Sequence, residues 1–401
     1  MSGTVPSHVS DDLVVDFDCF DIPGVDDDVQ VAWLRAVKAP GKDVFWTPRN
    51  GGHWVLTRPD DIERAYADHE HFSNRNYMIP RTERRFRPLP LGVDPPDHRK
   101  YRALIAPAFS PKAVRELASK ARAAAIELIE DLAPLGECDF VTDFAKVLPI
   151  VVFLGLAGLP VEERPTALPL AERFIRAATV EERTEAANQT ARYLHQWIER
   201  RRAEPQDDLI SRIVNSTIDG RPISTEETFG LLILLFNGGL DTVAAMLAFA
   251  FRHLAHHPEQ RHELAANPAL IPVAVEELLR RHGIIAQARE VNEDLELGGA
   301  RLKTGDMVQL PTMVYGLSAE TVEHPLDVDF HRPTPIPHTT FGNGVHKCPG
   351  ANLARQELQI VLEEWLPRIP DFEVAPGTTS RPATGAVSVI RSLPLVWCTT
   401  T

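Results

Sequence analysis

The stretch "FGNGVHKCPG", residues 341–350, places a single cysteine in a loop of glycines. Cys348 lies two residues after His346, and Pro349 follows it directly. The next segment, "ANLARQELQIVLEEWL" (351–366), has the pattern of a helix. A cysteine at a helix N-terminus is biased toward the thiolate, because the helix dipole favours negative charge there. The sequence around Cys348 therefore raises the question of what this thiol does.

Three chemistries could use this thiol. A nucleophilic cysteine needs a positioned base, for which His346 is a candidate, but no orienting residue is evident beyond Asn343. A buried cysteine with a purely structural role is the simplest alternative. The third is a thiolate bound to haem iron. Gly342, Gly344 and Gly350 favour this one, because they let the backbone pass close to a flat macrocycle.

The composition of the chain is that of an ordinary globular protein. It has 401 residues, 44% of them apolar and 24% charged, which is enough to bury a large core. No repeat or low-complexity linker divides the chain, so we expect one domain over residues 1–401. The net charge of −14 argues against nucleic acid and anionic membranes as partners, because both attract a basic surface.

The N-terminal segment and the apolar stretches bear on location. The start, "MSGTVPSHVSDD", has no basic stretch followed by an apolar run, so we expect a cytoplasmic protein without a secretory signal. The longest apolar stretch, 147–160, is shorter than the roughly 18 residues that a membrane span needs, and it predicts a buried helix. The four cysteines form no CxxC pair, which argues against a zinc cluster or a disulfide framework.

Helical patterns outnumber strand patterns along the chain. Two β-prone runs in 43–58 flank the sequence Asn-Gly-Gly, which predicts a hairpin, and strand-like pieces return at 292–312 and 385–397. The long helical patterns cover 111–133, 165–204 and 224–257. We therefore expect a mainly α fold with a small β region.

The helix pattern at 224–257 is marked at both ends. Ser224 and Glu227 have the spacing of a capping box, and Pro258 ends the pattern. At 1.5 Å per residue, such a helix is roughly 50 Å long, which is enough to cross a whole domain.

The centre of this helix pattern is unusual. Gly238 and Gly239 each cost about 1 kcal/mol relative to alanine in a helix interior, and Asp241 and Thr242 follow them in an otherwise apolar stretch. One interpretation is close helix packing, with the Thr242 hydroxyl bonded back to the Gly238 carbonyl. The other is a helix opened beside a flat ligand, with a hydroxyl and a carboxylate that handle protons.

Three motifs together resemble a known family. The pattern FGxGxHxCxG at 341–350 is similar to the haem-binding signature of cytochrome P450 monooxygenases, and "GGLDT" at 238–242 resembles their oxygen-activating motif. Glu277 and Arg280 match the family's Glu-x-x-Arg, with Arg332 as the third member of the group. Further stretches, from "NGGHW" to "LPLVW", resemble the camphor 5-monooxygenase subfamily over nearly the whole chain.

The resemblance implies a fold, a cofactor and a set of roles. The fold would be a triangular, mostly helical prism that encloses haem b, with the Cys348 thiolate as the axial iron ligand. Asp241 and Thr242 would deliver protons during oxygen activation. Glu277 with Arg280 and Arg332 would form a structural ion-pair network rather than a catalytic one. The residues that would contact the haem or its propionates are His98, Arg102, Arg289, His346, Phe341, Gly342 and Gly238.

The resemblance also implies a substrate pocket that departs from the camphor enzyme. Its expected members are Phe86, Met78, Leu234, Asn237, Ala386 and Val387. Phe86 takes the place of a tyrosine that bonds to the ketone in the relative, so a camphor-like ketone loses that donor here. Asn237 replaces an apolar contact, and it either anchors the substrate or bonds to its own helix backbone.

The implied activity is hydroxylation of an unactivated C–H bond of a small apolar terpenoid or norisoprenoid, either camphor-like or ionone-like. It would use O2 and two electrons from a [2Fe–2S] ferredoxin, which an NADH-dependent ferredoxin reductase reduces. Arg99, Arg102 and Lys347 would form the face that meets the ferredoxin, and the family default is a monomer. The alternative from another class is a haem-thiolate protein that binds or senses a gas without turnover.

Overall fold

Thirteen α-helices make up nearly half of the described part of the chain. The computed structural model describes residues 4–81, 87–176 and 180–399. The helices are α1 (Val29–Lys38), α2 (Pro59–Ala67), α3 (Asp97–Ile105), α4 (Pro111–Leu132), α5 (Leu148–Ala157), α6 (Arg164–Arg176), α7 (Val180–Ala203), α8 (Leu209–Val214), α9 (Thr225–His256), α10 (Pro258–Ala266), α11 (Ile271–Arg281), α12 (Thr312–Gly316) and α13 (Ala351–Arg368).

The strands are short and gather in small sheets. They are β1 (Val44–Thr47), β2 (His53–Leu56), β3 (Phe72–Ser73), β4 (Glu137–Asp139), β5 (Thr217–Ile218), β6 (Arg221–Pro222), β7 (Ala286–Val291), β8 (Leu295–Leu297), β9 (Ala300–Leu302), β10 (Met307–Pro311), β11 (Phe372–Val374), β12 (Pro382–Ala383), β13 (Val389–Ile390) and β14 (Pro394–Trp397). The largest sheet has the order β1-β2-β10-β7-β3.

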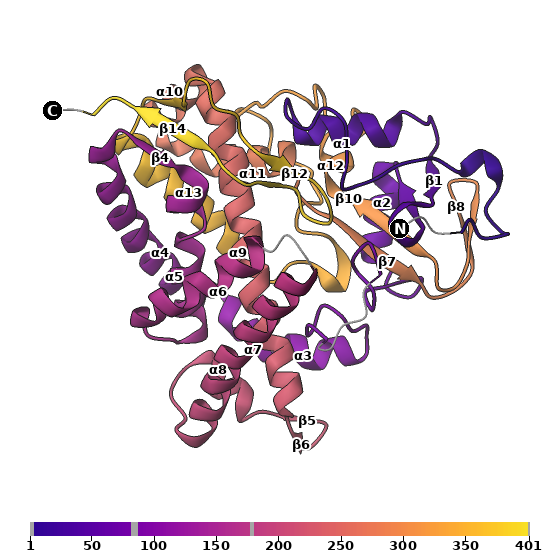
Figure 1. The fold of residues 1–401 in the computed structure, drawn as a ribbon, viewed down its shortest axis with the longest axis horizontal. Helices are drawn as coiled ribbons and strands as arrows, with labels where there is room; N and C mark the ends of the chain where they lie inside the picture. The colour runs from indigo at the N-terminus through magenta and orange to yellow at the C-terminus, as the bar shows by residue number, and fades with distance from the viewer. Residues whose placement is uncertain (1–3, 82–86, 177–179, 400–401) are drawn as a thin grey trace.

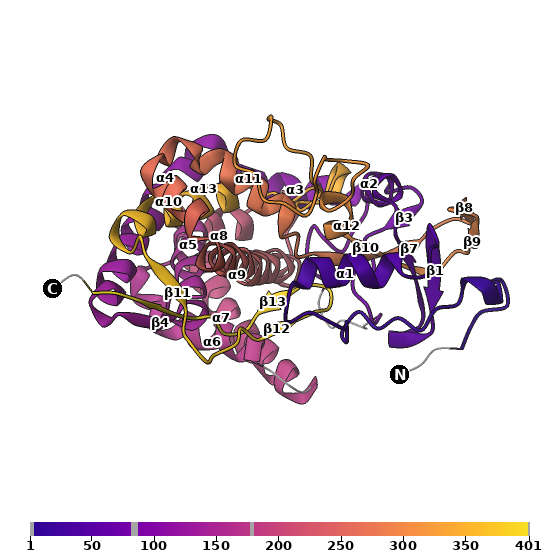
Figure 2. The same ribbon diagram turned by 90° about the horizontal axis from the view of Figure 1, so that it is seen from above.

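The helices and the main sheet lie on different sides of the molecule. Most of the long helices lie on one side, and the sheet with β1, β7 and β10 lies on the other (Figure 1). The central helix α9 runs through the helical side, and the second view looks nearly along its axis (Figure 2). The predicted hairpin is confirmed, because β1 and β2 pair antiparallel through Val44 with Leu56 and Thr47 with His53.

The helix α9 has the N-terminus that its sequence predicts. The Ser224 hydroxyl accepts from the Glu227 backbone N–H at 3.1 Å, and the Glu227 carboxylate accepts from the Ser224 N–H at 2.8 Å. By length and composition α9 could cross a membrane, but 61% of its most apolar window is buried inside the protein. This burial is typical of the core helix of a folded domain.

Two other predicted helices differ in their fit. The pattern at 111–133 corresponds to α4, which begins at Pro111 after the cap residue Ser110. The pattern at 165–204 corresponds to two helices, α6 and α7.

Candidate active site

A cavity of about 260 Å³ brings together residues that lie far apart in the sequence. Its wall includes parts of α9, the loop of Cys348, the start of α13, α3, α5, the edge of β7 and residues 90–91. The predicted site residues in this wall are His98, Arg102, Leu234, Gly238, Thr242, Arg289, Phe341, Gly342, His346 and Cys348.

The cysteine loop is held tightly by its own backbone. The Cys348 N–H donates to the Phe341 carbonyl at 2.9 Å, and the Gly342 N–H donates to the Thr339 carbonyl at 2.7 Å. Gly344 has φ of 65°, and a Cβ there would lie 2.8 Å from the Ala67 Cα, so a larger residue does not fit. The loop therefore presents Cys348 at a fixed position in the cavity wall.

The surroundings of Cys348 shift the pKa of its free thiol in opposite directions. Burial raises the pKa of the Cys348 thiol, although the Gly350 N–H, Arg102 and Arg355 lower it. Desolvation of the charged form is the largest of these effects. A bound metal ion would reverse this balance, since a coordinating thiol is deprotonated.

One face of α9 lines the cavity. Leu234, Leu235, Gly238, Gly239 and Thr242 line the cavity, and their spacing of i, i+1, i+4, i+5 and i+8 defines one side of a helix. A Cβ built at Gly238 or Gly239 would meet no heavy atom of the described residues within 4 Å. The glycines therefore leave open space along the helix, as a flat ring lying against it requires.

Thr242 and Asp241 are placed differently around this helix. Thr242 lines the cavity, and its Oγ1 donates to the Gly238 carbonyl at 2.8 Å, the bond expected for close helix packing. Asp241 lies beside the cavity wall rather than in it, because it is turned about 100° from its neighbour. Burial raises the pKa of Asp241 to about 6, while Lys146, after η5 (Phe140–Ala145), lowers it.

A group of cationic and imidazole side chains gathers at one edge of the cavity. The rings of His98 and His346 stack edge to face with centroids 4.4 Å apart. Both ring nitrogens of His98 lack a hydrogen-bond partner among the described residues, and burial lowers the pKa of His98 to about 4. His346 Nε2 lies 3.5 Å from Asp94 Oδ1. The Arg102 guanidinium donates to the Lys347 carbonyl at 2.8 Å.

Arg289 is the most deeply buried member of this group. Its side chain is 2% exposed, donates to its neighbour's carbonyl at 2.7 Å and lies 4.9 Å from the centre of the Tyr66 ring. In the described part of the chain it has no carboxylate partner in an ion pair. A buried guanidinium of this kind needs an anion. The residues of the cavity thus fit haem b, with free donors for its propionates and an open glycine face for its ring.

Several predicted pocket residues lie outside the cavity wall. Phe86 lies outside the described residues, and Met78, Asn237, Ala386 and Val387 are not in the wall. Asn237 faces away because it lies on the side of α9 next to Asp241. Val387 is close behind the wall, since it bridges to Ile285, which lines the cavity. Arg99 and Lys347 are exposed, as a docking face requires.

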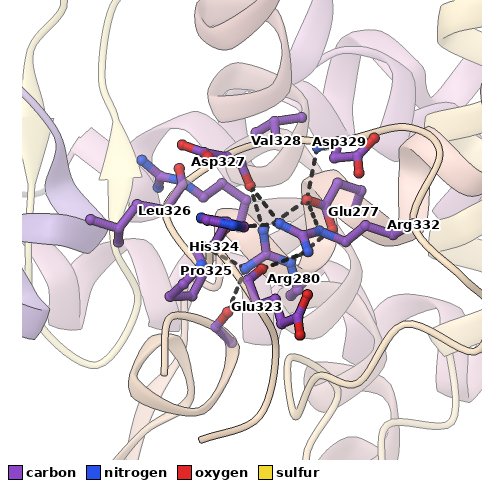
Figure 3. A network of polar contacts seen from close by, with 12 residues as sticks. Glu277, Arg280, Glu323, His324, Pro325, Leu326, Asp327, Val328, Asp329 and Arg332 are labelled. Atoms are coloured by element: carbon purple, nitrogen blue, oxygen red, sulfur yellow. Dashed lines mark hydrogen bonds and ion pairs between the residues drawn. The ribbon is translucent and has the colours of Figure 1, made fainter. Parts of the chain in front are cut away.

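The predicted ion-pair network is present away from the cavity. Arg280 binds both carboxylate oxygens of Glu277, at 2.7 and 2.8 Å, and Arg332 donates to one of them at 2.8 Å (Figure 3). The two guanidiniums also donate to the backbone carbonyls of residues 316, 323, 324, 325 and 327. Burial opposes ionisation of Glu277, but the two arginines lower its pKa below the ordinary value. None of the three residues lines the cavity.

The sequence reasoning missed Glu357. This residue of α13 lines the cavity, is 3% exposed, and has an Oε2 without a partner in the described part of the chain. Burial raises the pKa of Glu357 to about 8. The sequence did contain a sign of this residue. Glu357 lies beside Leu358 and Val361, on what is otherwise the apolar face of the helix, where a carboxylate is unusual.

Comparisons with known proteins agree with this geometry. The family model described as "Cytochrome P450" matches residues 265–398. The protein named probable cytochrome P450 127A1 from Sinorhizobium fredii is 34% identical over 406 residues, which cover 99% of this chain and 97% of that protein. The solved structure of CYP101C1 is similar with a TM-score of 0.91 and 38% identity, over 98% of this chain and 100% of that one. The structure of CYP101J2 has a TM-score of 0.89 and 37% identity, over 98% and 99%.

Proposed function

The chain belongs to the cytochrome P450 family, and from this we propose that it hydroxylates a small apolar terpenoid or norisoprenoid. It has the cytochrome P450 fold predicted from the sequence, and it is a monooxygenase that uses haem b with an axial cysteine thiolate. The monooxygenase class is therefore favoured over the alternative of a gas-binding or gas-sensing haem protein. The observation that carries the proposal is an apolar cavity whose wall includes both Cys348 and Thr242.

Cys348 is the proposed axial ligand. Of the four cysteines, all in the described part of the chain, only Cys348 lines the cavity. When bound, the haem supplies the activation of O2 and its insertion into a C–H bond. His98, Arg102, Arg289 and His346 would bind the propionates with donors that are otherwise unpaired or weakly paired. Phe341, Gly342 and Gly238 would form the wall against the ring.

Thr242 and Asp241 are the proposed proton-handling pair. Thr242 Oγ1 uses its hydrogen on the Gly238 carbonyl, so its lone pairs remain free to accept a proton donor in the cavity. Asp241, with a pKa of about 6, exchanges protons readily near neutral pH. Its place beside the wall allows it to pass protons from the protein surface toward Thr242.

The character of the cavity wall supports an apolar substrate. Apolar side chains dominate the wall, including Leu234 from α9, Val152 and Phe153 from α5, and Ile284 and Ile285 before β7. Such a wall binds a small hydrocarbon skeleton by excluding water from it. The resemblance to the camphor 5-monooxygenase subfamily, and the CYP101 names of two similar structures, support a terpenoid or norisoprenoid as the skeleton.

A ferredoxin is the proposed electron donor, itself reduced by an NADH-dependent reductase. Ferredoxins of the [2Fe–2S] class are acidic, and they need a basic face near the buried thiolate. Arg99 and Lys347 are exposed, and Arg102 links to Lys347 through its backbone carbonyl. We further propose a cytoplasmic monomer whose single domain spans residues 1–401.

Turnover and ligand titration test the proposed function together. The holoenzyme should show an optical spin-state shift with members of a panel of terpenoids and norisoprenoids, and should hydroxylate the tightest of them with O2, NADH, a ferredoxin and its reductase. A panel in which polar or charged compounds bind and ring hydrocarbons and ketones do not would contradict it.

A further inference from the structure

A short segment, residues 87–92, contacts α9 and forms part of the cavity wall. We name it the strap. Two backbone hydrogen bonds hold its turn, from Gly92 N–H to the Pro88 carbonyl at 2.8 Å and from the Val93 N–H to the Pro90 carbonyl at 3.3 Å. Pro90 and Leu91 of the strap line the cavity. The height of the strap over α9 therefore bears on the space available to a ligand.

The strap meets α9 at Gly230. The Leu89 N–H donates to the Gly230 carbonyl at 3.0 Å. A Cβ built at Gly230 would lie 2.5 Å from the Arg87 carbonyl oxygen, and 3.2 and 3.3 Å from two side-chain carbons of Leu89. Real Cβ atoms essentially never approach another atom closer than 3.0 Å. Since the nearest atom belongs to the backbone, it cannot turn away as a flexible side chain does.

Gly230 lies at a position in the helix where glycine is unfavourable. It lies in the interior of α9, where glycine costs about 1 kcal/mol relative to alanine. One helical turn later, Leu234 is the first residue of α9 in the cavity wall. Leu89 is buried against the apolar cluster that includes Ile105 and Phe229, so the strap is anchored from both sides.

We propose that Gly230 is a positioning residue that sets the height of the strap, and thereby the size of ligand that the cavity accepts. The proposal rests on the proposed function, because it concerns the substrate cavity of that enzyme. Gly230 does not line the cavity and acts through Pro90 and Leu91.

The substitution Gly230→Ala would lift the strap. To restore an ordinary contact with the new Cβ, the Arg87 carbonyl must retreat by roughly 1 Å, and the Leu89 hydrogen bond lengthens with it. Pro90 and Leu91 then recede from the cavity. A small ligand keeps its few contacts, whereas a longer ligand that reaches the strap gains room.

The experiment uses haem-loaded protein and two nitrogen ligands of different length, imidazole and 4-phenylimidazole, titrated by their optical shift. In Gly230→Ala, the ratio of the Kd of 4-phenylimidazole to that of imidazole should fall by about tenfold, because one methylene of extra room is worth at least that factor. A ratio within twofold of the wild-type value would overturn the proposal.

A matched control separates this effect from helix propensity. Gly155→Ala in α5 adds the same methyl group in a helix, where the nearest atoms are flexible ends of Leu117 and Lys120 at 3.2 and 3.4 Å. It should leave the ratio unchanged, and an equal fall in this variant would also overturn the proposal. If Gly230→Ala fails to incorporate haem, Leu89→Ala loosens the same anchor and should lower the ratio. An unchanged ratio there would count against the proposal.

The proposed function fails separately from this inference. A wild-type protein without a thiolate-haem carbonyl spectrum would refute the function, whatever the variants do. A normal carbonyl spectrum in the wild type and both variants, with unchanged ligand ratios, would refute only the role of Gly230.

Discussion

The Thr242 hydroxyl donates a hydrogen bond of 2.8 Å to the carbonyl of Gly238, one turn earlier in α9, and the same residue faces the cavity. The two interpretations of the glycine-rich centre of this helix are therefore compatible. The bond orients the hydroxyl, and the missing side chains at 238 and 239 leave the space beside it open. A fixed acceptor in an open apolar cavity is the arrangement that proton delivery requires.

The hydroxyl of Thr242 should control how electrons are used. Thr242→Ala removes the oriented acceptor without touching the haem contacts, so haem and substrate binding should persist while NADH oxidation yields mainly hydrogen peroxide. Thr242→Ser keeps the hydroxyl and should restore most of the coupling. The measurement is product and peroxide formed per NADH, and equal coupling in the alanine variant and the wild type would contradict the role.

Replacing Arg289 should stabilise the haem-free protein and weaken its binding of haem. Without an anion, its buried charge is unpaired in the described part of the chain, so Arg289→Met should raise the thermal midpoint of the haem-free protein. The same variant should bind haem more weakly, because a propionate loses its partner. Arg289→Lys keeps the charge and should lie between. If Arg289→Met lowers both the midpoint and haem affinity, the side chain has a packing role instead.

The network around Glu277 should be essential to stability. Glu277→Gln leaves two buried guanidiniums without their carboxylate, which should lower the free energy of unfolding by about 3 to 5 kcal/mol. The control is Glu296→Gln, which removes an exposed pair with Arg301 whose side chains are 76% and 75% exposed. That variant should unfold like the wild type in a denaturant titration. Similar losses in both variants would contradict a special role for the buried group.

Glu357 should make the stability depend on pH between 4.5 and about 8. Burial raises the pKa of Glu357 to about 8 from an ordinary value of 4.5, so the folded protein keeps a proton that the unfolded chain releases. Its stabilising contribution is complete below pH 4.5 and is lost as the pH rises through 8.

The corresponding measurement is the thermal midpoint of the holoenzyme at pH values between these limits. The midpoint should fall with pH more steeply in the wild type than in Glu357→Gln, whereas Glu373→Gln, at an exposed site, should keep the wild-type slope. Parallel slopes in the wild type and Glu357→Gln would show that the carboxyl group does not titrate in this way.

Local patterns predicted the local features of this fold. The capping box of Ser224 and Glu227 and the hairpin at 43–58 each depend on residues close in sequence, and both are present. The parallel pairing of β10 with β2 joins segments some 250 residues apart, and no short pattern contains it. Glu357 was missed for the same reason. Its carboxylate lacks a hydrogen-bond partner in the described part of the chain, and this depends on residues that are distant in sequence.

The motifs predicted most of the site residues, but they did not predict what surrounds those residues. The motif at 341–350 and the glycines at 238–239 were expected to meet one ligand, and the cavity joins them. Which side of α9 faces the cavity, and the desolvation that raises the pKa of Cys348, follow only from the packed structure. Asn237 was placed in the pocket from its position in a motif, although its side of the helix faces elsewhere.

The central claim is that Cys348 binds the haem iron as a thiolate, and the optical spectrum of the reduced carbon monoxide complex tests it most directly. The wild type should show the Soret band strongly shifted to the red that is peculiar to thiolate haem, and Cys348→His should lose the band while retaining haem. Cys138→Ser, at a buried cysteine outside the cavity wall, should leave it unchanged. A wild-type spectrum like that of a globin, or a red-shifted band that persists in Cys348→His, would contradict the claim.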